Sequence, residues 1–141
     1  MRQNCFVAAL LLCAFCASCQ QAWAQPNAIE REVKAMPGRD LRIGVYVNIR
    51  TDCTSGPLPA IRLAAAPTHG TVGVKRAMFK ATNLKRCLAT EVPAFVAFYR
   101  AALGYSGADS FDLEISFSGG RKELQHFRVS VANGAGDAGG I

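Results

Sequence analysis

Histidine is scarce in this chain, since His69 and His126 are the only two among 141 residues. Cysteine is scarce as well once the N-terminal region is set aside, because four of the six cysteines lie within residues 1–24. The other two, Cys53 and Cys87, have no C-x-x-C spacing and no histidine beside them, which disfavours a zinc site. The sequence therefore predicts neither a metal site nor a cofactor.

Long hydrophobic runs are confined to the N-terminus. Residues 6–15 form an apolar stretch that is short for a membrane span, and Arg2 precedes it. Residues 22–24 read Ala-Trp-Ala, so the pattern predicts an export signal over residues 1–24 that is cleaved after Ala24. Two alternatives remain open, an uncleaved anchor and a lipoprotein acylated at Cys19. No later segment is apolar enough to span a membrane, and we expect a periplasmic or extracellular protein.

Regular helical periodicity is also absent, and the remaining length suits one domain. Residues 25–131 are too few for a large enzyme with a deep cleft but sufficient for a core between two sheets. Residues 132–141 contain almost nothing that could be buried, and we expect a flexible glycine-rich tail.

Alternation of apolar and polar residues replaces helical periodicity along most of the domain. In residues 41–49 the alternation predicts one strand whose buried face excludes Tyr46. The residues expected on that buried face are Leu41, Ile43, Val45, Val47 and Ile49. The clearest alternation runs over residues 111–117, and a glycine turn follows it. About seven such strands predict an antiparallel immunoglobulin-like β-sandwich.

Acidic residues are missing from residues 75–86, a segment that holds five cations. These are Lys75, Arg76, Lys80, Lys85 and Arg86. Without Arg2 the chain has fifteen Lys and Arg against ten Asp and Glu, so this segment equals the whole positive excess. It is either a solvated strand pair and loop or a binding surface for an anionic partner such as an acidic polysaccharide, lipopolysaccharide or anionic lipid. No nucleic-acid motif is present, and nucleic acid is not expected as a partner.

The cysteine pair predicts one disulfide. In an exported chain an isolated pair is most simply bonded to itself, so we expect Cys53 to join Cys87. The bond would close a loop of about 35 residues and stabilise the fold by roughly 3 to 4 kcal/mol in the chain-entropy model.

Two short motifs carry a family resemblance. Residues 67–72 read Pro-Thr-His-Gly-Thr-Val, and residues 104–111 read Gly-Tyr-Ser-Gly-Ala-Asp-Ser-Phe. Together they resemble the bacterial cadherin-like and immunoglobulin-like domains of secreted proteins, and the resemblance extends in pattern over residues 40–131. It implies the sandwich fold and export, and it implies structural roles in turns for the motif residues. These are His69, Gly70, Gly104, Tyr105, Gly107, Asp109 and Phe111.

Chemical interpretations of the same residues are weaker. Asp109, Asp112 and Glu114 form the only acidic cluster, which supplies few of the six to eight oxygens that calcium needs. Ser106 lies in a partial G-x-S-x-G pattern, but the turn precedes a strand and not a helix. We therefore expect a non-catalytic interaction module that binds a protein or envelope glycan. The alternatives are a structural or assembly component of a cell-surface system and, more remotely, a hydrolase.

Overall fold

The structure of the chain is a computed structural model that describes residues 28–82, 85–88 and 90–133. The predicted export signal, residues 1–24, lies outside the described residues. Of the predicted tail, residues 132–141, the structure describes only Ala132 and Asn133.

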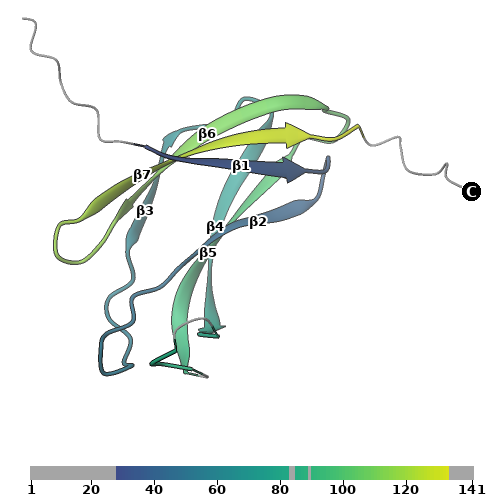
Figure 1. The fold of residues 1–141 in the computed structure, drawn as a ribbon. Coiled ribbons are helices and arrows are strands. Elements are labelled where there is room, and N and C mark those ends of the chain that lie inside the picture. Colours follow the sequence, from purple (N-terminus) through teal and green to yellow (C-terminus); the bar gives the residue numbers. More distant parts are fainter. Residues whose placement is uncertain (1–27, 83–84, 89, 134–141) are drawn as a thin grey trace, which may run out of the picture.

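Seven β-strands form two sheets that face each other (Figure 1). The strands are β1 (Ile29–Ala35), β2 (Asp40–Tyr46), β3 (Ala60–Ala65), β4 (Gly70–Lys80), β5 (Glu91–Ala101), β6 (Gly107–Ser116) and β7 (Lys122–Val131). One sheet has the order β1-β7-β6-β3 and the other has the order β2-β5-β4. This is the strand order of an immunoglobulin-like sandwich, with β1 placed beside the last strand. The predicted fold class is confirmed.

The first strand departs from the antiparallel expectation. β1 pairs with β7 in parallel, from Ile29 opposite Gln125 to Ala35 opposite Val131. The chain then crosses to the other sheet through a short turn. In this turn the Gly38 amide donates a hydrogen bond to the Ala101 carbonyl at the end of β5. Because β2 lies in the opposite sheet, β1 must take the vacant edge beside β7, where both strands run the same way.

A bulge in β2 reverses the predicted alternation of its side chains. The pairing of β2 with β5 shifts register between Arg42 and Gly44, and one extra residue moves the following side chains to the other face. Tyr46 is therefore only 7% exposed and belongs to the core, whereas Val45 is half-buried. The prediction that Val45 points inward and Tyr46 outward was wrong. A Cβ atom on Gly44 would lie 2.7 Å from the Tyr46 hydroxyl, so glycine leaves room for that ring.

The strand predicted over residues 41–49 also ends early. β2 stops at Tyr46, and Ile49 forms only an isolated bridge with Ser55. Residues 47–59 instead form the long connection between the two sheets.

Three stacked aromatic rings form the centre of the core. The Phe111 ring lies 4.7 Å from the Phe127 ring and 5.5 Å from the Tyr99 ring, measured between centroids. Each of these residues is at most 1% exposed. They come from β6, β7 and β5, so the stack joins the two sheets, and aromatic pairs of this kind add about 0.5–1.5 kcal/mol to the effect of area burial.

A buried polar contact also joins the two sheets. The Tyr46 hydroxyl donates a hydrogen bond of 2.8 Å to the side-chain oxygen of Gln125, which is 3% exposed. The Gln125 amide in turn donates to Glu123. Burial raises the pKa of the Tyr46 phenol to about 12, so the phenol remains a donor at neutral pH.

The turns gather at two ends of the sandwich. One end holds the turns at residues 36–39, 66–69 and 102–106, and the other holds the loops at residues 47–59 and 117–121 together with the described residues between β4 and β5. β4 and β5 are the longest strands, and their hairpin extends past the other sheet toward the second end (Figure 1). The part of β4 that extends past the other sheet therefore has less of the molecule packed against it.

Candidate functional site

A buried carboxylate joins the two turns in which the sequence motifs lie. Asp109, 8% exposed, accepts hydrogen bonds from the backbone amides of Thr68 and His69 at 3.0 and 3.1 Å. It also accepts from the Tyr99 hydroxyl at 2.7 Å and from the Ser110 amide at 2.9 Å. Two of the four donors come from the turn about forty residues upstream, so the two motifs form one structural unit.

The hydrogen bonds around Asp109 determine its charge. Burial alone would raise the pKa of this carboxyl, but the bonds from Tyr99, Thr68, Ser110 and His69 together hold it below its ordinary value. Burial raises the pKa of the Tyr99 phenol, and the neighbouring Asp109 carboxylate raises it further. At neutral pH the carboxylate is charged and the phenol is protonated, which is the combination that makes the strongest hydrogen bond.

A stacked pair of rings covers the same end of the sandwich. The His69 and Tyr105 rings lie 4.0 Å apart and within 7° of parallel, and the Tyr105 hydroxyl donates to the Ala108 carbonyl at 2.5 Å. A Cβ atom on Gly70 would lie 2.6 Å from the Arg100 carbonyl oxygen, so only glycine fits there. Both glycines of the second motif, Gly104 and Gly107, have positive φ. The site residues of the two motifs thus build a turn structure.

The predicted disulfide is present. Cys53, in the loop after β2, is bonded to Cys87, in the loop after β4, and their Cα atoms are 5.3 Å apart. A disulfide within one chain indicates an oxidising compartment.

The five cations of the basic segment form no ion pair with any described carboxylate. Lys75, Arg76 and Lys80 lie on β4 and Lys85 and Arg86 lie in the following loop, all of them exposed. By contrast, five cations elsewhere bind carboxylates at 2.8 to 3.8 Å. Those are Arg62, Arg100, Arg121, Lys122 and Arg128. Five more exposed cations in the described part of the chain also form no ion pair, namely Arg31, Lys34, Arg39, Arg42 and Arg50. The basic segment differs from them because it gathers five such cations within twelve residues that include no acid.

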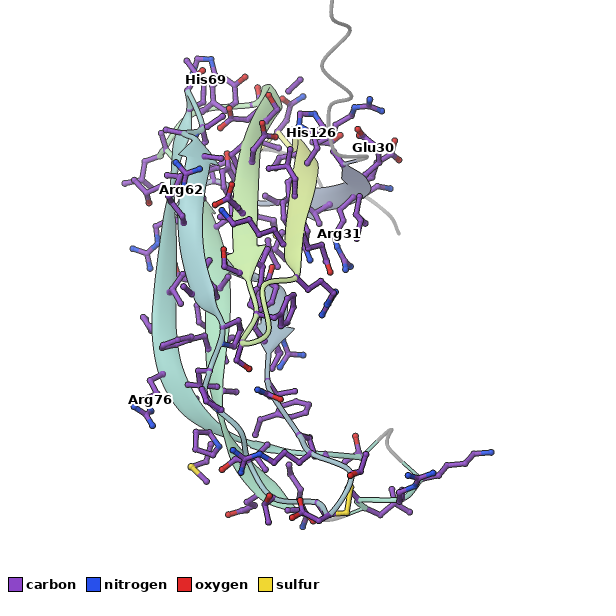
Figure 2. The ribbon with its side chains drawn as sticks, turned by 90° about the vertical axis from the view of Figure 1, so that its left-hand side faces the viewer. Glu30, Arg31, Arg62, His69, Arg76 and His126 are labelled. Carbon is purple, nitrogen blue, oxygen red and sulfur yellow. A yellow bond between two sulfur atoms is a disulfide. The ribbon has the colours of Figure 1, made fainter. Side chains whose placement is uncertain are left out.

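The basic side chains do not form one flat patch. Lys75 pairs with Val96 and its Nζ lies 5.3 Å from the centre of the Phe98 ring, on one face of the sheet. Arg76 pairs with Phe95, so its side chain lies on the opposite face. Figure 2 shows Arg76 at the border of the molecule, pointing away from both sheets. The cations flank the edge of β4 on both sides.

The two histidines have separate environments. His126 Nδ1 lies 2.5 Å from Asp112 Oδ1 on the outer face of the four-stranded sheet, whereas the His69 ring stacks on Tyr105 (Figure 2). Within the described part of the chain, no side-chain hydrogen bond joins Ser106 to either histidine. The serine, histidine and acid of the hydrolase alternative are therefore not brought together as one unit around Ser106.

A groove on the outer face of the four-stranded sheet was not predicted from the sequence. The groove has a volume of about 780 Å³, and Glu32, Lys34, Ser110, His126 and Arg128 contribute to its lining. Charges of both signs alternate along it, and Arg128 is already bound to Glu30 at 3.3 Å. Such a surface has no net preference for a charged ligand.

The acidic cluster on β6 does not converge on one point. Asp109 lies on the buried face of the strand, whereas Asp112 and Glu114 lie on the outer face. Glu114 binds Arg62 and Lys122 there, and Asp112 contacts His126. Among residues 28–82, 85–88 and 90–133, no group of three or more His, Cys, Asp or Glu is placed to hold a metal ion.

Comparisons with known proteins leave the family open. No model of a known protein family matches the chain, and no curated protein is similar to it. In the part of the chain that the structure describes, no helix has the length and hydropathy to cross a bilayer.

Proposed function

We propose that this chain is an exported, non-catalytic interaction module that binds a protein or envelope glycan carrying negative charge. The observation that carries the proposal is the set of exposed cations on β4 and its loop, none of which has a described carboxylate as partner. Elsewhere in the described part of the chain, five exposed arginines and lysines are bound to acids, and the five that are not are spread over separate segments between β1 and the loop after β2. A surface that keeps its cations unpaired attracts anions at long range.

Export to the periplasm or the extracellular space fits two further observations. Residues 1–24 have the pattern of a cleaved signal, with Cys19 as a lipid-anchor alternative. The bond between Cys53 and Cys87 requires oxidising conditions in most organisms. The resemblance to bacterial cadherin-like and immunoglobulin-like domains points to the same compartment.

A second function, as an assembly component of a cell-surface system, is favoured by one observation. β4 is a long strand at the border of its sheet, and such strands join subunits when another chain pairs with them. The two functions differ in whether the partner is held permanently or reversibly.

Binding as a function of salt tests the proposed function. The purified, disulfide-bonded chain is titrated with heparin, with polyglutamate and with vesicles that contain phosphatidylglycerol. We expect binding to at least one probe at low salt and a steep loss toward physiological salt, where charges are screened beyond about 8 Å.

Charge reversal provides the matched comparison. Lys75→Glu with Arg76→Glu should weaken binding about tenfold, because attraction becomes repulsion at two sites. Lys34→Glu with Arg39→Glu changes the net charge equally, on β1 and in the turn after it, and should have a much smaller effect. If none of the probes binds at low salt, or if both double variants weaken binding equally, the basic segment is only a solvated surface.

A further inference from the structure

β4 is the longest edge strand in the described part of the chain. It spans eleven residues and pairs with β5 without any register shift. The edge strands β2 and β3 are shorter, and each contains a register shift that interrupts its outer edge. β1 is also short and alternates acids with bases, as in Glu30, Arg31 and Glu32. Bulges, short length and charged side chains protect edges from pairing. β4 is long and has no bulge, and its charged side chains are all of one sign, so they repel a basic strand but not an acidic one.

The hydrogen bonds at both ends of β4 show which backbone groups face away from β5. The Ala102 amide donates to the His69 carbonyl at 2.8 Å, and the Ala81 amide donates to the Thr90 carbonyl at 3.1 Å. Each bond joins two residues that lie directly opposite one another in the register of β4 and β5. Hydrogen-bonded pairs alternate with non-hydrogen-bonded pairs along an antiparallel ladder, so the odd-numbered residues of β4 bond to β5. The N–H and C=O groups of the even-numbered residues therefore point outward. Those residues are Gly70, Val72, Val74, Arg76, Met78 and Lys80.

Side chains beside this outward edge combine apolar surface with positive charge. Val74 is 42% exposed and Met78 is 62% exposed, on the same face as Arg76 and Lys80. Lys75 lies on the other face. An added strand would place its own side chains alternately on these two faces, so it could reach cations on both. A flat membrane surface or a rigid glycan lying on one face would reach only one set.

A second copy of this chain is a poor partner for the same edge. The charged residues of β4 are all cations, namely Lys75, Arg76 and Lys80. Two such edges placed side by side would bring like charges opposite one another, which destabilises a strand pair. The charge instead complements a strand that carries acids.

We propose that β4 binds an extended acidic segment of a partner protein, which adds to the sheet as an antiparallel strand. This inference rests on the proposed function and identifies its partner as a peptide segment and not a glycan or lipid. On the face of the even-numbered residues the segment alternates acidic and apolar side chains, with acids opposite Arg76 and Lys80 and apolar residues opposite Val74 and Met78. On the other face an acid lies opposite Lys75. Backbone hydrogen bonds to the even-numbered residues hold the strand, and the ion pairs select it.

A peptide with blocked ends and the sequence Glu-Thr-Val-Thr-Glu-Glu-Val is the probe. In antiparallel register its first residue lies opposite Lys80 and its last opposite Val74. The N–H groups of its third and fifth residues then face β4, whereas those of the fourth and sixth face solvent. One analogue is N-methylated at the third and fifth residues, and the control analogue is N-methylated at the fourth and sixth.

The two analogues have the same charge and composition, so they separate strand addition from simple attraction. We expect the inward-methylated peptide to bind about tenfold more weakly than the control analogue, because it loses two backbone donors. Binding of the unmodified peptide should also weaken in Lys75→Glu with Arg76→Glu.

Three outcomes would overturn this inference, and only the third would also remove the proposed function. Equal binding of the two analogues would mean that charge alone attracts the peptide. Binding of heparin or of anionic vesicles without binding of the peptide would make the partner a glycan or a lipid. In both cases an anionic partner would still stand. Absence of binding to peptide, polyglutamate, heparin and vesicles alike would remove the proposed function as well.

Discussion

At the scale of single residues, the carboxylate of Asp109 organises one end of the sandwich. Its four donors come from three parts of the chain: the turn before β4, β5 and the start of β6. A buried charge is costly unless every lone pair is used, and here backbone amides and the Tyr99 hydroxyl supply the donors. The spacing between the two sequence motifs thus reflects a direct hydrogen-bonded contact between their turns.

Replacing this carboxylate by an amide should destabilise the fold. Asp109→Asn leaves one acceptor oxygen and turns an NH₂ group toward buried donors, so we expect a loss of about 3 kcal/mol in the free energy of unfolding. Asp112→Asn is the control, because Asp112 is half-buried with a single partner, His126, and should lose less than about 1 kcal/mol. Urea unfolding measures both, and equal losses would show that the hydrogen bonds to Asp109 contribute little.

The stability lost in Asp109→Asn should depend on pH. The folded-state pKa of Asp109 lies below its ordinary value of 3.8, so folding favours the charged form. Its stabilisation is complete above the unfolded-state pKa and disappears as the pH falls through the lower folded-state pKa. The stability difference between wild type and Asp109→Asn should therefore narrow as the pH falls below 3.8, as followed by urea unfolding at several pH values. A difference that stays constant into strong acid would contradict this assignment of charge.

Phe111 and Ser106 should respond very differently to truncation. Phe111 is 1% exposed between two stacked rings, so Phe111→Ala empties the core and should cost about 3 to 5 kcal/mol. Ser106 is exposed in a turn, and Ser106→Ala should change stability by less than about 0.5 kcal/mol. Thermal melts of both variants distinguish them, and small shifts for both would mean that the buried face of β6 is misassigned.

At the scale of elements, the two edges of the three-stranded sheet are built differently. β2 is short and carries a bulge beside a glycine over which the Tyr46 ring packs. β4 is long, regular and basic, and its outward backbone groups form an unbroken row. A bulged edge resists pairing with another strand, whereas a regular edge permits it, so the proposed partner strand is expected at β4 and not at β2.

Substitutions of two glycines in this sheet test whether the Tyr46 ring needs the space beside Gly44. Gly44→Ala would place a Cβ atom 2.7 Å from the Tyr46 hydroxyl, and displacement of the ring should cost about 2 kcal/mol. Gly73→Ala on β4 meets no atom within 4 Å and should leave stability unchanged or raise it slightly. The comparison uses urea midpoints of the two variants. Equal effects would mean that the ring of Tyr46 has other room to move.

At the scale of the whole molecule, the disulfide and the core stabilise different regions. The aromatic stack lies between the two sheets, and the bond between Cys53 and Cys87 lies at the far end of the β4–β5 hairpin (Figure 2). It ties that hairpin to the loop that crosses from one sheet to the other. The extended hairpin, which carries the basic surface, is thereby linked to the rest of the fold.

Removing the disulfide should lower the stability of the whole chain. The two cysteines are separated by 34 positions in the sequence. Cys53→Ser with Cys87→Ser removes this loop closure and should lower the free energy of unfolding by about 3 to 4 kcal/mol in the chain-entropy model. Thermal melts measure the loss, and mass spectrometry of the non-reduced wild type should show one internal crosslink. Two free thiols or an intermolecular dimer in the wild type would contradict the assignment.

Local alternation was sufficient to predict much of this fold. The inward face of β6 follows from the period of two, and Phe111, Leu113 and Ile115 are all buried as their spacing predicts. The disulfide followed from counting, because only two cysteines remain beyond the export pattern. Both inferences depend on neighbouring residues or on composition, which the sequence contains directly.

Contacts between distant segments were decided only by the tertiary structure. A single extra residue in β2 placed Tyr46 in the core, and alternation cannot reveal a bulge because the register depends on the partner strand. The parallel position of β1 and the donors of Asp109 likewise depend on which strands meet. The sequence identified the five cations but not which charges have partners, because a surface charge is paired or unpaired according to the carboxylates that folding brings beside it.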